Sequence, residues 1–237
     1  MADRKDKLPD KAKSTSDDVA AFLDRLAHTP AVRPAGERGR LIFAMDATAS
    51  REPTWDRACH IQGEMFKETE ALGGLEVQLV FYRGFGECKA SPWLDNPEAL
   101  VRRMTAVQCL GGQTQIGRVL RHAMAETRKR RVNALVFVGD CMEEDVDRLC
   151  HEAGELGLLG VPMFVFHEGA DPVAERAFRQ FAKLTGGAYC RFDAASATQL
   201  RALLGAVAVY AAGGRRALED YGRRAGADVL RITAQIK

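Results

Sequence analysis

The stretch LIFAMDATAS, residues 41–50, joins an apolar run to three side chains that carry oxygen atoms. Its first five residues are too few and too apolar for a surface helix, and they predict a strand buried on both faces, as in a parallel sheet. Asp46, Thr48 and Ser50 then fall in the loop that follows this strand. Ligands bind at that edge of open α/β sheets, because loops converge there and the following helices direct their positive ends at it. The loop is therefore a candidate site.

Further strands and helices alternate along the chain on both sides of this stretch. Apolar runs at 133–140 and 160–167 predict two more buried strands, and 186–192 predicts a short last one. The segment 75–84 is expected to form an antiparallel edge hairpin with 87–93 through a glycine-rich turn. Apolar residues at helical spacing predict helices at 53–72, 97–107 and 116–131, then after 145, after 172 and from 200 to a pair of glycines at 213 and 214.

This alternation indicates one α/β domain at 37–212. We expect a doubly wound, mostly parallel sheet with one antiparallel edge hairpin strand and helices on both faces. Residues 1–36 form an N-terminal extension with one short helix, which Ser16 can cap and whose apolar stripe is expected to dock on the domain. Residues 213–237 read as a charged C-terminal tail.

Composition excludes several classes of function. The chain has 237 residues, 46% of them hydrophobic, and a net charge of only +2, so no global field attracts nucleic acid. No apolar stretch is long enough to span or insert in a bilayer, and the polar N-terminal region does not resemble a secretory signal. Six cysteines lie scattered without a CxxC pair, as expected of reduced thiols. We therefore expect a cytoplasmic protein.

Three loops at one edge of the predicted sheet carry oxygen ligands. Asp46, Thr48 and Ser50 come from the first loop, Thr114 from the second and Asp140 from the third. Helix capping alone could explain Thr114 and Asp140, since such residues satisfy free N–H groups at helix starts, but one cap does not need three oxygens on alternate residues. An oxygen-only set of ligands suits a hard cation such as Mg²⁺, with Mn²⁺ or Ca²⁺ as alternatives.

The segments DATAS, GGQTQIG and VFVGD resemble the DxSxS, Thr and Asp elements of the metal-ion-dependent adhesion site (MIDAS) of von Willebrand factor type A (VWA) domains. The resemblance covers residues 40–212 and implies the Rossmann-like VWA fold, in an intracellular member of bacterial type. It also implies that the five side chains hold Mg²⁺ with an open coordination position, which an Asp or Glu of a partner protein completes. The protein would then be a scaffold or assembly component.

Two positions depart from the family pattern. Thr48 replaces the commoner serine, and its hydroxyl can still act as a ligand. Asp140 is followed closely by Glu143 and Glu144, an acidic pair that could compete for the ion or repel an acidic partner.

Two other functions remain open on the sequence. A Mg²⁺-dependent phosphohydrolase of the haloacid-dehalogenase type would use Asp46 as its nucleophile. Such enzymes place a second Asp two residues later as general acid, and the hydroxyl of Thr48 cannot transfer a proton near neutral pH in that role. Nucleotide binding on a Rossmann-like sheet is disfavoured because the first strand is not followed by GxGxxG and the chain has no GxxxxGK[ST].

Overall fold

The structure, a computed structural model, describes residues 16–29, 38–51, 74–192 and 197–233. The helix predicted at 53–72 lies outside the described residues, as do residues 1–15 of the N-terminal extension.

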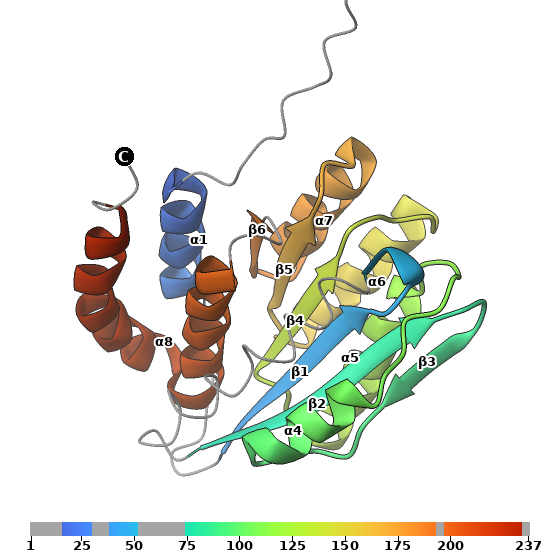
Figure 1. The fold of residues 1–237 in the computed structure, drawn as a ribbon, viewed down its shortest axis with the longest axis horizontal. Coiled ribbons are helices and arrows are strands. Elements are labelled where there is room, and N and C mark those ends of the chain that lie inside the picture. Colours follow the sequence, from blue (N-terminus) through green and yellow to red (C-terminus); the bar gives the residue numbers. More distant parts are fainter. Residues whose placement is uncertain (1–15, 30–37, 52–73, 193–196, 234–237) are drawn as a thin grey trace, which may run out of the picture.

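The described strands form one six-stranded sheet in the order β3-β2-β1-β4-β5-β6, and every neighbouring pair is parallel except β2 with β3 (Figure 1). The strands are β1 (Gly39–Asp46), β2 (Leu75–Arg83), β3 (Glu87–Ala90), β4 (Ala134–Gly139), β5 (Met163–Glu168) and β6 (Ala188–Phe192). Every residue of β1 is buried, because this strand lies between β2 and β4 with helices over both faces. The predicted fold class, including the antiparallel edge hairpin, is confirmed.

Helices cover the sheet on both sides (Figure 1). They are α1 (Ser16–His28), α4 (Pro97–Thr105), α5 (Ile116–Lys129), α6 (Val146–Leu158), α7 (Pro172–Leu184) and α8 (Ala197–Thr233), with a short 3₁₀ turn η1 (Ala49–Arg51) after β1. Alternate residues of β1 supply two separate cores. Leu41, Phe43 and Met45 pack with α1, α4 and α8, whereas Ile42 and Ala44 pack with α5, α6 and α7. Among the described helices, none is both long and apolar enough to cross a membrane.

Helix α1 is part of the core, as its apolar stripe predicts. Phe22 and Leu26 are 1% and 0% exposed. The ring of Phe22 lies 6.1 Å from that of Phe164 and 5.4 Å from that of Phe166, both on β5. The helix also contacts α8 and β6, so the docking expected of this extension is confirmed.

Helix α8 continues into the C-terminal segment. The predicted helix end corresponds to a break at Gly214, whose backbone is non-helical with a φ of 70°. The chain then resumes a helix that continues to Thr233, so the residues interpreted as a charged tail are mostly helical. Leu218 is 4% exposed and Tyr221 packs beside it. These apolar residues recur three positions apart among charged ones, and this spacing lets the segment form a second amphipathic helix.

Candidate metal centre

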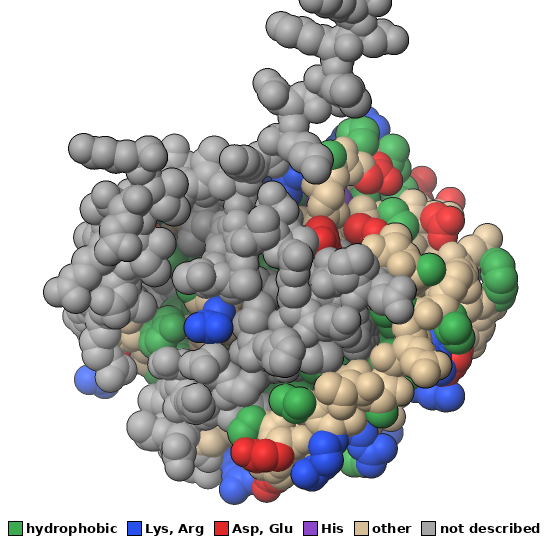
Figure 2. All heavy atoms as spheres, in the orientation of Figure 1, with side chains coloured by type: hydrophobic (Ala, Val, Ile, Leu, Met, Phe, Trp, Pro, Cys, Tyr) green, Lys and Arg blue, Asp and Glu red, His purple; other side chains and the backbone are tan. Residues whose placement is uncertain are grey.

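The candidate site lies where β1 and β4 end side by side. Asp46 is the last residue of β1, and Asp140 directly follows β4. Since the two strands are parallel neighbours, their carboxyl ends meet at one edge of the sheet. Carboxylate oxygens of Asp46 and Asp140 and the Sγ of Cys141 lie within 4.8 Å of one another. Figure 2 shows acidic and hydrophobic side chains together at the upper right of the molecule, where these strands end in Figure 1.

The first loop folds its three oxygen-bearing side chains toward this point. The Thr48 backbone N–H donates to Asp46 Oδ1 at 2.7 Å, in a buried contact. The hydroxyls of Thr48 and Ser50 lie 3.2 Å apart, and the Ser50 hydroxyl donates to Asp140 Oδ2 at 2.8 Å. Asp46, Thr48, Ser50 and Asp140 therefore form one connected set, although Asp140 is 90 residues or more from the others in sequence.

Thr114 contacts the loop after β4, the loop that begins with Asp140. Its side chain is buried at 4% exposure, and its Oγ1 accepts a 3.0 Å hydrogen bond from the backbone N–H of Glu143. The Thr114 N–H in turn donates to Glu143 Oε2 at 2.9 Å. The structure thus ties Thr114 to the segment that begins with Asp140, but these hydrogen bonds go to Glu143 and not to the other four predicted ligands.

Neither Thr114 nor Asp140 caps a helix, so the capping interpretation is wrong for both. The N-cap of α5 is Gln115, whose side chain makes no capping hydrogen bond, and that of α6 is Asp145, whose carboxylate accepts from the N–H of Arg148 at 2.8 Å. The first turn of α5 is satisfied instead by Glu144, which accepts from the N–H groups of residues 116 and 117 at 2.5 and 3.0 Å. Glu143 and Glu144, the acidic pair that follows Asp140, are thus both hydrogen-bonded to residues 114–117.

Comparison with solved structures identifies the fold. The VWA domain of SpRpn10 matches at a TM-score of 0.54 and 12% identity, over 76% of this chain and 98% of that one. Proximal thread matrix protein 1 from the mussel byssus, with a zinc-occupied MIDAS motif, matches at 0.59 and 13%, over 76% of this chain and 48% of that one. The pilus adhesin SpaC from Lactobacillus rhamnosus GG, in its open conformation, matches at 0.58 and 12%, over 76% and 30%.

This chain has the VWA fold. It spans less than half of the matrix protein and of the adhesin. No family model matches the sequence, and no curated protein matches it at a significant level. The likeness therefore concerns the arrangement of strands and helices, which the motifs in the sequence also predict.

Cys141, one of the six scattered cysteines, is a direct neighbour of the candidate site. Its burial, and secondly the adjacent charge of Asp140, raise the pKa of the thiol to about 12. The thiol is therefore neutral at physiological pH. Its position directly after Asp140 was the only signal in the sequence that could have indicated this proximity.

His167 lies next to the candidate site and contacts the backbone of Asp140. It is fully buried on β5, and its Nε2 lies 3.2 Å from the backbone oxygen of Asp140 while its Nδ1 lies 2.8 Å from the hydroxyl of Tyr189. A carbonyl oxygen can only accept, so Nε2 carries the proton, and in the neutral ring Nδ1 accepts from Tyr189. This pair of hydrogen bonds fixes the peptide that carries the Asp140 side chain.

Replacing His167 by phenylalanine is expected to weaken divalent cation binding by about tenfold, the lower end of the effect of removing an outer hydrogen-bond partner at metal sites. The reason is that the backbone oxygen of Asp140 loses its hydrogen bond from His167 Nε2. Titration calorimetry with Mg²⁺ measures the change. Phe178→Leu is the control, because that ring lies 5.2 Å from the His167 ring in the same core but makes no hydrogen bond to Asp140. Equal affinities in wild type and His167→Phe would contradict the supporting role.

His122, which is half-buried, and His167, which is fully buried, predict a fold that is less stable in mild acid. Burial lowers the pKa of His122 and of His167 below the ordinary 6.5. The unfolded chain then takes up protons before the folded one, so their contribution to stability is present above about pH 6.5 and is lost as pH falls through the lower folded pKa. Urea unfolding across this range should show a smaller loss of stability in His122→Gln than in wild type. Identical pH dependence in the two proteins would contradict this prediction.

The residues present fit a hard divalent cation. The donor set contains two carboxylates and hydroxyl groups, which is the chemistry that Mg²⁺, Mn²⁺ and Ca²⁺ prefer. In the described part of the chain, Asp140 Oδ1 is buried and accepts no hydrogen bond. A buried carboxylate oxygen without a donor is costly, and a bound cation would satisfy it.

Proposed function

We propose that this protein is a metal-dependent protein-binding module of scaffold or assembly type. Its ion would be Mg²⁺, with Mn²⁺ or Ca²⁺ as alternatives, held by Asp46, Thr48, Ser50, Thr114 and Asp140. When bound, the cation would supply positive charge and an open coordination position for an Asp or Glu of a partner protein. The chain's own residues would hold that position at the edge of the sheet and leave it accessible from solvent.

The observation that carries this proposal is the convergence of two carboxylates. Asp46 and Asp140 come from different strands, yet their oxygen atoms lie within 4.8 Å, and the Ser50 hydroxyl donates to one of them. Like charges at this separation repel each other in a partly buried site, and a divalent cation converts that repulsion into attraction. The zinc reported in the MIDAS motif of the matrix protein, which shares this fold, supports the same role for this edge of the sheet.

We do not propose an enzymatic function. The phosphohydrolase alternative needs a proton donor two residues after Asp46, and Thr48 occupies that position with its hydroxyl directed to Ser50. Nor does the alternative account for the hydrogen bonds between Thr114 and Glu143. A cytoplasmic location is proposed on the spacing of the six cysteines, which are scattered along the chain without a CxxC pair.

The test is a pull-down from cell extract with the full chain as bait. A partner should be retained in Mg²⁺, released by a chelator and absent with Thr114→Ala. Thr105→Ala is the matched control, because Thr105 is an exposed residue of α4 whose hydroxyl contacts only its own helix. A partner retained equally in chelator and by both variants would show that binding does not use this site.

A further inference from the structure

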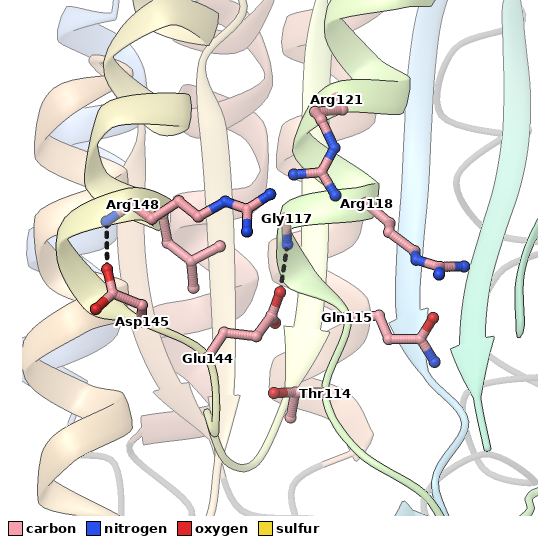
Figure 3. A pocket seen from close by; sticks show the side chains of 9 residues that line it. Thr114, Gln115, Gly117, Arg118, Arg121, Glu144, Asp145 and Arg148 are labelled. Atoms are coloured by element: carbon pink, nitrogen blue, oxygen red, sulfur yellow. Dashed lines mark hydrogen bonds between the residues drawn. The ribbon is translucent and has the colours of Figure 1, made fainter. Parts of the chain in front are cut away.

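A cavity of about 270 Å³ adjoins the candidate metal centre, between the first turns of α5 and α6 (Figure 3). Thr114 lines this cavity and is also one of the five proposed ligands. The cavity continues from Thr114 past Gly117 to the side chains of Arg121 and Arg148, whose guanidinium groups extend toward each other in Figure 3. A ligand segment that reaches the metal centre can therefore continue into this cavity.

Arg121 and Arg148 share a single carboxylate partner. Arg121 Nη1 donates to Glu152 Oε1, and Arg148 Nε lies 3.4 Å from the same oxygen. Two guanidinium groups thus share one carboxylate, which leaves several of their N–H donors for a ligand. The Arg121 and Arg148 side chains are 45% and 69% exposed, whereas that of Glu152 is 10% exposed. The cations are accessible from solvent, and the anion lies beneath them.

The other carboxylates of the cavity are already engaged by helix ends. Glu144 accepts from two backbone N–H groups of α5, and Asp145 accepts from one of α6. Gly117 keeps the floor open, because a Cβ there would lie 2.9 Å from Glu152 Oε2 and 3.1 Å from Arg121 Nη1. The donors that remain for a ligand are therefore the arginine N–H groups, which are suited to a carboxylate.

We propose that the cavity binds a second acidic side chain of the same partner segment, so that the ligand of this protein is a diacidic peptide. The inference rests on the proposed function, because the first acid is the one at the metal centre. Five residues of α5 from its start to Arg121 correspond to about 8 Å at 1.5 Å per residue. An extended peptide advances roughly 3.3 Å per residue, so a second acid two or three residues after the first spans this length of helix.

The first experiment compares two fluorescein-labelled peptides by anisotropy, with the full chain in Mg²⁺. One carries Asp and, three residues later, Glu in a Gly-Ser background, and the other has Gln in place of that Glu. The diacidic peptide should bind about threefold to fivefold more tightly, the effect of one exposed ion pair. This advantage should vanish in Arg148→Gln and persist in Arg102→Gln, which removes an exposed arginine from α4 on the opposite face of the sheet. Equal binding of both peptides to wild type, or an advantage that survives in Arg148→Gln, would overturn the inference.

The second experiment separates this inference from the proposed function. Tri-glutamate is titrated into ¹⁵N-labelled protein in excess chelator, and the arginine Nε–Hε signals are recorded. Signals of Arg121 and Arg148, assigned with the Gln variants, should shift although the metal is absent. If they shift while neither peptide binds in a Mg²⁺-dependent way, the cavity inference holds and the metal-dependent function fails. If Mg²⁺-dependent binding is found without these shifts, the function stands and the cavity inference fails.

Discussion

Asp46→Asn is expected to weaken Mg²⁺ binding by about a hundredfold or more while the protein stays folded. Removing a hydrogen-bond partner of a metal ligand lowers metal affinity by up to about a hundredfold, and removing the ligand itself should lower it at least as much. In the wild-type protein the Thr48 N–H donates to Asp46 Oδ1 at 2.7 Å. The side-chain oxygen of asparagine can accept the same hydrogen bond, so the loop keeps its turn. Without metal, the variant should be as stable as wild type or more so, because the two carboxylates no longer repel each other.

Titration calorimetry measures the affinity for Mg²⁺, and thermal unfolding measures how much bound Mg²⁺ stabilises the fold. Mg²⁺ at about 100 times its dissociation constant should stabilise wild type by about 2.7 kcal/mol and leave Asp46→Asn unaffected. Asp171→Asn is the matched control: Asp171 caps α7 just beyond β5 at the same edge of the sheet, and asparagine caps equally well. Unchanged affinity in Asp46→Asn would defeat the proposed metal centre.

Gly39→Ala is expected to lower the free energy of unfolding by about 3 kcal/mol, the upper end of the cost of overpacking a core. A Cβ at Gly39 would lie 2.3 Å from the backbone oxygen of Ala211 and 2.6 Å from Cα of Ala212. These are backbone atoms of α8 and cannot rotate away. The substitution therefore forces α8 away from the start of β1, the strand that ends at Asp46.

Urea denaturation tests this prediction with a control of opposite sign. Gly154 lies inside α6, and a Cβ there would meet no atom within 4 Å. Gly154→Ala should therefore stabilise the protein by about 0.5–1 kcal/mol, the difference in helix propensity. If both alanine variants lost or gained the same stability, the close packing of α8 on β1 would not be a constraint on this fold.

The sheet could be predicted because its physical requirements are local. A strand between two parallel neighbours needs apolar side chains on both faces, and the runs that form β1, β4 and β5 meet this need without interruption. The glycine-rich turn likewise marks the edge hairpin. The spacing of apolar residues fixes the orientation of a helix less well: Val173 and Leu184 in α7 are 46% and 37% exposed, whereas Phe178 is fully buried. Apolar residues spaced four positions apart do not determine which side of a helix faces the sheet to better than one residue position.

The candidate site was predictable only in part because some of its contacts are long-range. Asp46 and Asp140 could be brought together from the rule that neighbouring parallel strands end at one edge. The capping of α5 by Glu144 spans 28 residues, and the support of Asp140 by His167 spans 27. No local pattern encodes such contacts, so neither the bonding of Glu144 to α5 nor that of His167 to Asp140 could be predicted from the sequence.

A crystal of the full chain grown with Mn²⁺ tests the central claim most directly, because manganese scatters anomalously and replaces Mg²⁺ at oxygen sites. The account predicts an anomalous peak between the carboxylates of Asp46 and Asp140, bordered by the Ser50 hydroxyl and with Thr114 within reach of the ion or its waters. An anomalous map without a peak at this edge of the sheet, in crystals whose soaking solution saturates the protein by calorimetry, would contradict it.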